Sequence, residues 1–388
     1  MNRLRNPITP IGDAITLVAV GDVSPNREDP PSIFRFCREV LRRADIVFGQ
    51  MEAPLSDRGR PQFVPSAPYR LRPHNISALS ATGAGFDVMS FACNHAMDWG
   101  EDAFFDTIEI LQKNGIEVVG AGKNLQEARI PVIIEKRGTK VGFLAYTAIL
   151  PLGLEAGEDI PGCAPLRASH YYRQLNYQPG TPPLIVTELV PEYREAMEQD
   201  IKKLRSVVDI LVVSIHAGVF GVPAMIAMYQ KEAGRAAVDA GADLVLQAHA
   251  HILKGIEMYK GKAIFYGLGN FAVEHTVPDP SRPQGRDPDF LLYGRFVLRH
   301  TERVPAYEKH VHHPDALKTI IAKAYVRQRR IDKVVYLPTF INPDLEPEVL
   351  SRQDKRAHQV FDYVKRISEA ESLNVNFHWD GDEVVITE

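Results

Sequence analysis

The chain has 388 residues, 45% of them hydrophobic and 24% charged, which is the composition of a soluble globular protein of one large domain or two. Its formal net charge of −4 argues against nucleic acid and against an anionic membrane surface as main partners. The three cysteines form no C-x-x-C pair and give no sign of an oxidising compartment.

The first stretch, "MNRLRNPITPIGDAITLVAVGDVSP", carries two arginines, but prolines and Asp13 interrupt it before any apolar run long enough for a signal peptide. The sequence also lacks a run of about 18 apolar residues, the length that a transmembrane helix needs. We therefore expect a cytoplasmic protein with no membrane partner.

Five segments along the chain share one pattern, an apolar run of strand length that ends at polar residues of the kind that bind ligands. Continuous apolar runs of this length suit strands that are buried on both faces, as in a parallel sheet covered by helices. In chain order the segments are "AITLVAVGDVS" from residue 14, "ADIVFGQME" from 44, "FDVMSFACNH" from 86, "VDILVVSIHAG" from 208 and "ADLVLQAHAH" from 242.

Helical patterns lie between these strands, and antiparallel hairpins are predicted in two further places. The alternation of strands and helices predicts an α/β architecture. Helices are predicted over residues 31–43, 102–114, 191–207, 223–240 and 354–372, and hairpins over 131–147 and 255–271.

The polar residues at the strand ends are expected to converge, because ligands of open α/β sheets bind beyond the carboxyl ends of the strands. His249 and His251 are two apart, so in a strand both rings would lie on one face. The candidate metal ligands are Asp22, Glu52, Asn94, His216, His249 and His251, with His95 beside them.

This mixed set of carboxylate, imidazole and amide oxygen suits divalent manganese, zinc or iron. Cysteine is absent from the set, which argues against a structural zinc knuckle. Six ligands exceed what one tetrahedral ion needs. Two ions that share a bridging carboxylate would use all six, and a hydroxide between ions about 3.5–4 Å apart is an effective nucleophile at neutral pH.

The order of these residues resembles the calcineurin-like metallophosphoesterases. More closely, "GDV", "MEAPL", "NHAMDWG", "VVGAGKN" and "GADLVLQAHAHILKGIEMYKGKAIFYGLGNF" resemble the CapA family of capsule and poly-γ-glutamate biosynthesis proteins, from about residue 15 to about 275. The resemblance implies a layered α/β sandwich of two mixed sheets flanked by helices. We expect one domain over residues 14–300 with a lid-like insertion at 148–190, and a C-terminal extension, 301–388, that packs on the same domain.

Carried over by position, the resemblance implies that Asp22 and His251 hold one ion, that Asn94, His216 and His249 hold the other, and that Glu52 bridges them.

It also implies that His95 is the general acid that protonates the leaving group. Asp98, the second catalytic candidate, would accept a hydrogen bond from the His95 ring and orient it. The alternatives are a packed neutral histidine at position 95 and a helix N-cap at position 98.

The sequence departs from the family pattern at three places near these motifs. Gln50 stands where the family usually has asparagine, Ala217 follows His216 where a tryptophan is usual, and Ser24 stands where phosphoesterases carry a histidine. The last change weakens the first ion site or removes it, so we expect one or two divalent ions.

Four arginines are candidates for binding a substrate, because guanidinium groups suit carboxylate and phosphate. Arg27 follows the first strand, Arg70 and Arg72 would share one face of an extended segment, and Arg167 lies in a long Pro- and Gly-rich segment from residue 148. We expect that segment to cover the site; the alternative is a plain surface excursion.

The primary hypothesis is a hydrolase in which a metal-activated hydroxide attacks a small anionic ester, phosphoester or γ-glutamyl-type amide, with His95 as the acid. A metal-dependent lyase is an alternative at the same centre. A second class of function is a non-catalytic subunit of a capsule or poly-γ-glutamate assembly, and a third is a metal store or sensor. An oligomer is possible.

Overall fold

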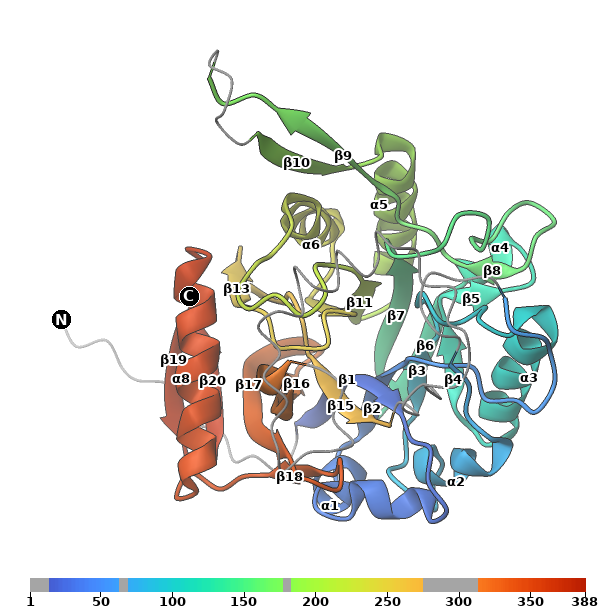
Figure 1. Ribbon diagram of the computed structural model, residues 1–388. Coiled ribbons are helices and arrows are strands. Elements are labelled where there is room, and N and C mark those ends of the chain that lie inside the picture. The colour runs from blue at the N-terminus through green and yellow to red at the C-terminus, as the bar shows by residue number, and fades with distance from the viewer. Residues whose placement is uncertain (1–13, 63–68, 177–182, 275–312) are drawn as a thin grey trace.

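The computed structural model describes residues 14–62, 69–176, 183–274 and 313–388, and the structural statements below refer to these residues. Two mixed β-sheets lie at the centre, with helices around them (Figure 1). The predicted α/β architecture of two mixed sheets flanked by helices is therefore confirmed.

The larger sheet has ten strands in the order β19-β20-β17-β16-β1-β2-β3-β4, and β15 and β18 pair with β1 and β17. Strands β1 to β4 and β15 are parallel, whereas β16 to β20 pair in antiparallel fashion. The C-terminal strands thus continue the sheet that β1 begins. The bounds are β1 Ile15–Ser24, β2 Ile46–Met51, β3 Val88–Ser90, β4 Glu117–Val119, β15 Asn270–Val273, β16 Lys318–Arg327, β17 Arg330–Ile341, β18 Pro347–Val349, β19 Asn376–Asp380 and β20 Glu383–Thr387.

The second sheet has six strands in the order β13-β14-β12-β11-β7-β6. It is parallel at its centre and antiparallel at both edges, where the two predicted hairpins form β6/β7 and β13/β14. The bounds are β6 Val132–Lys136, β7 Thr139–Thr147, β11 Ile210–His216, β12 Leu244–Ala248, β13 Ile256–Tyr259 and β14 Lys262–Phe265.

The main core lies between the two sheets. Phe48 of β2 stacks on Phe143 of β7, with ring centroids 5.7 Å apart, and both rings are buried. A second core covers the other face of the six-stranded sheet, where helix α5 (Pro191–Arg205) buries Met197, Ile201 and Leu204. This spacing places the three side chains on one helical face, as the sequence predicts.

The predicted helices at 102–114, 191–207 and 354–372 are confirmed as α3, α5 and α8, whereas two predictions were too long. Residues 31–43 form a short 3₁₀ turn, Pro30–Phe34, and then α1. Helix α6 begins at Met228 rather than at 223, because Ala224 has a φ of 61°, which a right-handed helix does not accept. The bounds are α1 Arg38–Arg42, α2 Ile76–Leu79, α3 Gly100–Lys113, α4 Leu125–Ala128, α6 Met228–Ala240 and α8 Lys355–Ala370.

The segment from residue 148 to 190 contains regular structure. Strand β8 (Gly162–Cys163) pairs with β5 (Ala121–Gly122), and β9 (Ala168–Arg173) pairs with β10 (Leu184–Leu189) as a hairpin. In Figure 1 this hairpin stands out from the body of the molecule. That the segment covers the site stays a prediction. Among the helices of the described residues, none has the length and apolar character needed to cross a membrane.

Candidate metal centre

The carboxyl ends of strands from both sheets meet at one place. Asp22 lies near the end of β1, Glu52 directly follows β2, and His216 is the last residue of β11. All three side chains are fully buried. A ligand atom from each lies within 4.8 Å of the other two, a grouping that could hold a metal ion.

A close backbone approach sets the position of Asp22. A Cβ atom on residue 21 would lie 1.9 Å from the carbonyl oxygen of Gly269, so only glycine fits there. The Asp22 N–H donates to that same oxygen at 3.0 Å, and Asp22 is in register with Asn270 of β15. The glycine pair thus places the first carboxylate beside β15.

His251 lies on the Asp22 side of the centre. Its Nδ1 is 3.4 Å from Asp22 Oδ2, and its Nε2 is 3.5 Å from Glu52 Oε1. Asn270 Oδ1 lies 2.7 Å from the same Nδ1, so a proton on Nδ1 can be donated to Asn270, which leaves Nε2 with its lone pair toward Glu52. Asn270 is the first residue of β15 and lies in the "GLGNF" motif, but nothing in the sequence pattern marks it as a partner of His251.

Asn94, His216 and His249 form a second group. Asn94 Oδ1 is 2.8 Å from His216 Nε2 and 3.2 Å from His249 Nδ1, and the two histidine nitrogens are 3.2 Å apart. Glu52 Oε2 lies 3.7 Å from His216 Nε2. Glu52 therefore faces His251 with one oxygen and the second group with the other.

The geometry expected for the two neighbouring histidines was wrong. Strand β12 ends at Ala248, and His249 and His251 lie beyond it with φ angles of 92° and 56°. The backbone of both residues lies in the left-handed region, which residues other than glycine rarely adopt. Their rings are 6.2 Å apart between centroids and serve different partners, one in each group. The turn, and not strand alternation, brings them together.

The donor set fits a divalent cation. Both carboxylate oxygens of Asp22, both of Glu52 and the Nδ1 of His216 are buried without a hydrogen-bond partner. Buried polar atoms normally have partners, so atoms left in this way point to a group that the described residues do not supply. The absence of thiolate ligands and the mix of oxygen and nitrogen donors suit manganese, zinc or iron.

Burial shifts the titration of these side chains toward their neutral forms. It raises the pKa of Asp22 to about 8, and together with the charges of Asp22 and Asp98 it holds the pKa of Glu52 well above its usual range. Burial likewise lowers the pKa of His216 and His249 well below the usual value, and that of His251 to about 4. Neutral imidazoles are the form that binds metal.

His95 and Asp98 form a buried pair beside the centre. His95 Nδ1 lies 2.7 Å from Asp98 Oδ2, which also accepts the Tyr69 N–H at 2.8 Å. The Tyr69 ring meets the His95 ring edge-on at 4.8 Å between centroids. The alternative of a helix N-cap at Asp98 is wrong, because α3 begins at Gly100 and its N-cap is Trp99.

The positions that depart from the family pattern are also buried. The Gln50 amide donates to the carbonyl oxygens of Met51, Ser90 and Ala92, so it ties β2 to the end of β3. The Gln50 side-chain oxygen and the Ser24 hydroxyl have no hydrogen-bond partner among the described residues. Ala217, in place of a tryptophan, is fully buried and projects no side chain beyond its methyl group.

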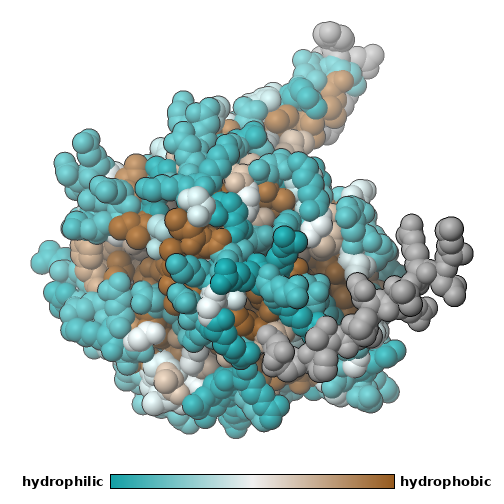
Figure 2. Space-filling model, turned by 180° about the vertical axis from the view of Figure 1, so that it is seen from behind, coloured by the Kyte–Doolittle hydropathy of each residue, from teal (hydrophilic) through white to brown (hydrophobic). Residues whose placement is uncertain are grey.

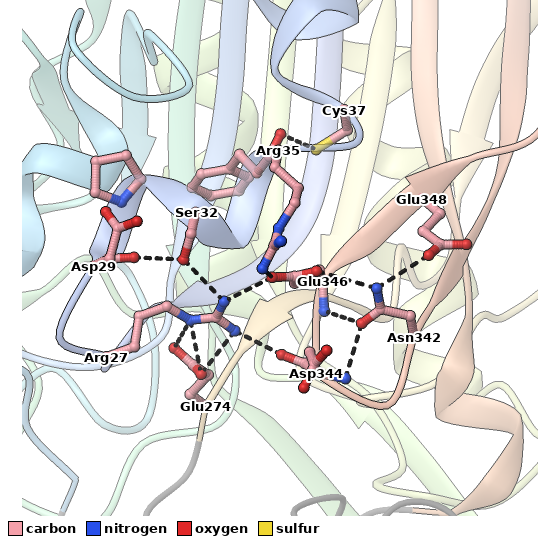
Figure 3. Close-up of polar contacts among 12 residues, drawn as sticks. Arg27, Asp29, Ser32, Arg35, Cys37, Glu274, Asn342, Asp344, Glu346 and Glu348 are labelled. Atoms are coloured by element: carbon pink, nitrogen blue, oxygen red, sulfur yellow. Dashed lines mark hydrogen bonds and ion pairs between the residues drawn. The ribbon is translucent and has the colours of Figure 1, made fainter.

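Arg27 is held by the protein's own groups (Figure 3). Its Nε lies 3.1 Å from both carboxylate oxygens of Glu274, and the terminal nitrogens bond to Ser32, Glu346, Glu274 and the carbonyl of Asp344. These contacts use all five N–H donors of the guanidinium. No donor remains for a substrate in this arrangement, so we correct the prediction and assign Arg27 a structural role.

The other three predicted arginines lie outside the metal cluster. The Arg70 guanidinium stacks over the Trp99 ring at 3.8 Å from its centroid, and Arg72 is exposed. Both follow Tyr69, so they lie close along the chain to the residue that contacts His95. Arg167 forms an ion pair with Glu155. Their roles in substrate binding stay predictions.

A groove of about 950 Å³ opens elsewhere, between α4, β6 and α5, and is lined by Arg129, Ile133 and Asp200 among others. None of the predicted site residues lines it. Its volume would suit a small ligand, but it holds no unmatched ligand atoms of the kind found at the ends of β1 and β2. The chemistry therefore points to the buried cluster.

Comparison with known proteins identifies relatives that match the part of the chain that contains the candidate metal centre. The model of the family described as "Bacterial capsule synthesis protein PGA_cap" matches residues 8–275. The PGA biosynthesis protein CapA of Bacillus subtilis (strain 168) is 27% identical over 278 residues, covering 68% of this chain and 64% of the relative. The capsule biosynthesis protein CapA of Bacillus anthracis is 27% identical over 274 residues, covering 68% of this chain and 60% of the relative.

The chain thus spans less than two thirds of the length of these relatives. Among solved structures, the calcineurin-like phosphoesterase YfkN from Bacillus subtilis is similar with a TM-score of 0.37 and 11% sequence identity. That similarity covers 92% of this chain and 98% of the other.

Proposed function

The chain belongs to the family of bacterial capsule synthesis proteins of the PGA_cap type, and from that premise we propose that it is a metal-dependent hydrolase. Its substrate is a small anionic ester, phosphoester or γ-glutamyl-type amide. The observation that carries the proposal is the buried cluster around Asp22 and Glu52, whose four carboxylate oxygens have no partner in the described residues. Such a cluster costs stability unless a cation completes it.

Two groups of residues would hold the metal. Asp22 and His251 would bind one ion, Asn94, His216 and His249 a second, and Glu52 would contact both. When bound, a divalent ion supplies Lewis acidity and lowers the pKa of water enough to provide a nucleophile at neutral pH. The ions that suit these ligands are manganese, zinc and iron.

His95 is the proton donor in this proposal. Asp98 accepts from Nδ1 at 2.7 Å and stabilises the charged ring, which leaves Nε2–H as the group that can protonate a leaving group. His95 is close enough for its charge to lower the pKa of His216, His249 and His251. Asp98 is a positioning residue, since it acts through His95.

The segment that follows Tyr69 supports an anionic substrate. Tyr69 contacts His95 and Asp98, and Arg70 and Arg72 come directly after it. Arg72 is exposed and forms no ion pair with a described residue. A guanidinium near the proton donor would hold a phosphate or carboxylate group by paired hydrogen bonds.

Metal content tests the proposal first. Protein purified from manganese-, iron- and zinc-supplemented cultures is compared with the His249→Ala/His251→Ala double variant and with His378→Ala, a matched change at an exposed histidine of β19. We expect about two equivalents in the wild type and in His378→Ala, and loss in the double variant. One equivalent would indicate a single ion, and no metal under any supplement would overturn the mechanism.

Activity of the metal-loaded protein is the second test. A panel of phosphoesters, carboxylic esters and γ-glutamyl amides is assayed with wild type and with His95→Ala. Loss of a general acid lowers kcat by roughly 10²- to 10⁴-fold while metal content stays unchanged. Metal-loaded protein that cleaves nothing in the panel would favour the non-catalytic role in a capsule or poly-γ-glutamate assembly. Product formed without incorporation of labelled water would favour a lyase.

A further inference from the structure

The hairpin of β9 and β10, residues 168–173 and 184–189, forms an arm that projects from the body (Figure 1). Only its base is anchored. Leu189 is buried there, and the Thr187 hydroxyl accepts the N–H of Tyr229 in α6 at 3.3 Å. Beyond that base, β9 has exposed side chains along most of its length.

The arm exposes more apolar surface than a free ribbon should. Tyr171 is 45% exposed on one face of the arm, and Tyr172 and Ile185, which are 69% and 56% exposed, lie on the other face. Hydrophobic side chains are visible on the projecting arm in Figure 2. A lone two-stranded hairpin is at best marginally stable in water. Exposed apolar side chains on such a ribbon indicate a surface that is covered in the functional state.

Strand register divides the arm into two faces. Opposite residues of an antiparallel pair project to the same side, so the face that carries Thr187 is the one turned to α6. The other, which we call the outer face, consists of three cross-strand pairs. From the base to the tip they are Ser169 with Glu188, Tyr171 with Val186, and Arg173 with Leu184.

The outer face carries a negative charge near its base, an apolar pair in the middle and a positive charge toward the tip. Neither Glu188 nor Arg173 forms an ion pair with any described residue, and both are exposed. Adjacent pairs on this face are two residues apart along each strand, so each charge lies about 7 Å along the strand from the central pair of Tyr171 and Val186.

We infer that the outer face of the arm binds the same face of a second copy of this chain. A two-fold axis in the plane of the interface, passing through the Tyr171–Val186 pair and inclined to it so that the two arms cross, turns base toward tip. It places Arg173 beside the partner's Glu188, and Glu188 beside the partner's Arg173. An interface between identical surfaces must be self-complementary, and this order of charges is. A partner of one charge sign would match only one end of the face.

The inference does not rest on the proposed hydrolase, because no residue of the arm belongs to the metal cluster. It adds a specific surface to the oligomer that the sequence leaves open. The two ion pairs set the direction of the arms, and the central tyrosines and valines supply the buried apolar area.

Charge reversal tests the inference on the full chain by sedimentation velocity over a range of concentrations. We expect a wild-type dimer. Arg173→Glu places acid against acid at both symmetric contacts, and Glu188→Arg places base against base, so each change weakens the dimer about tenfold or more. The Arg173→Glu/Glu188→Arg double variant restores opposite charges and should dimerise like the wild type.

Mixing the two single variants gives the sharpest result. One chain then carries two acidic groups and the other two basic groups, so a mixed dimer should form although neither variant dimerises well alone. A wild type that stays monomeric up to its solubility limit would overturn the inference, as would reversals that leave the dimer unchanged. Thermal unfolding of each variant shows whether it folds, and a Tyr171→Ser change should weaken the dimer without any change of charge.

Discussion

Two clusters that contain buried carboxylates each include a residue at or just after the end of β1, and they differ in how the protein treats those carboxylates. At the candidate metal centre, Asp22 and Glu52 are fully buried, and their oxygens have no hydrogen-bond partner among the described residues. In the second cluster Arg27, which follows β1, lies between Glu274 and Glu346, and its guanidinium is 3.0 Å from Glu346 Oε1 (Figure 3). Among the residues that the structure describes, one cluster contains an arginine as counter-charge and the other contains none.

The difference separates a structural cluster from a binding cluster. Burying a charge costs stability unless a partner offsets the lost hydration. Although burial lowers it, Glu274 and Glu346 raise the pKa of the Arg27 guanidinium above its ordinary value, whereas burial raises the pKa of Asp22 to about 8. At the candidate centre the described residues supply no ion-paired lysine or arginine for the buried acids, and a cation bound there would provide the missing charge.

Replacing Glu52 by glutamine should have the largest effect on metal binding. The change keeps the shape but removes the charge that faces both groups of ligands. Metal affinity should fall by more than the roughly 10- to 100-fold that loss of an outer partner costs. Stability of the metal-free protein should change by no more than about 1 kcal/mol, because burial holds the pKa of Glu52 well above its usual range and thus favours the neutral carboxyl. Competition with a metal buffer and thermal unfolding measure both quantities.

The corresponding change in the cluster around Arg27, Glu346→Gln, should lower the stability of the protein and leave its metal content unchanged. Glu346 is 1% exposed, and its loss deprives Arg27 of one of two counter-charges. Breaking a buried pair in this way costs on the order of 3 kcal/mol, and the exposed Arg35 contact adds little to that. A Glu346→Gln variant that unfolds like the wild type but loses metal would contradict the assignment of Glu346 to a structural cluster.

Asn270→Ala tests how far the binding cluster extends. Without its Oδ1 the His251 ring loses the acceptor that fixes Nδ1, so metal affinity should fall about 10- to 100-fold. Asn270→Asp keeps an acceptor and serves as the matched variant, with the smaller loss. Isothermal titration with Mn²⁺ or Zn²⁺ distinguishes the two. Equal affinity in Asn270→Ala would remove Asn270 from the centre.

The smallest effect is the pH dependence of the metal-free protein. The folded pKa of Asp22, about 8, lies above its unfolded value, so its contribution to stability is present at low pH and is lost as pH rises toward 8. His251, with a folded pKa of about 4, acts in the opposite sense, and its contribution is lost only as pH falls below about 6.5.

Between pH 6.5 and 8 the titration of the carboxyl groups therefore dominates the pH dependence of stability. Over this range the free energy of unfolding of the protein kept metal-free with a chelator should fall by roughly 1–2 kcal/mol. Added metal should abolish this loss, because it stabilises the ionised carboxylates. Urea unfolding at three pH values, with and without metal, checks the sign. Stability that rises with pH over this window in the chelated protein would contradict it.

Much of the binding cluster could be predicted from the sequence. Buried parallel strands leave unbroken apolar runs, and the polar residues at their ends, such as Asp22, Glu52 and His216, stand out against them. Because the carboxyl ends of parallel strands meet at one edge of a sheet, residues at these ends are expected to lie close together in space. The structure brings together the six residues proposed as metal ligands.

The counter-charged cluster could not be predicted in this way. Arg27 meets Glu274 and Glu346 only because distant parts of the chain fold beside β1, and such pairs leave no local pattern. The same holds for Asn270. It lies in β15 of the ten-stranded sheet, whereas its partner His251 follows β12 of the six-stranded sheet. The left-handed backbone at His249 and His251 could not be predicted, because histidine rarely adopts this conformation and only the surrounding tertiary structure imposes it.

The pairing of β1 with β15 also governs when the centre can exist during synthesis. Asp22 is made early, yet its neighbour in the sheet, Asn270, is among the last residues of the family-matched part. At roughly 5–20 residues per second the ribosome needs on the order of tens of seconds between them. The first candidate ligands therefore leave the ribosome well before the residues that complete the centre, so any ion that the centre holds would be bound only after β15 has joined the sheet.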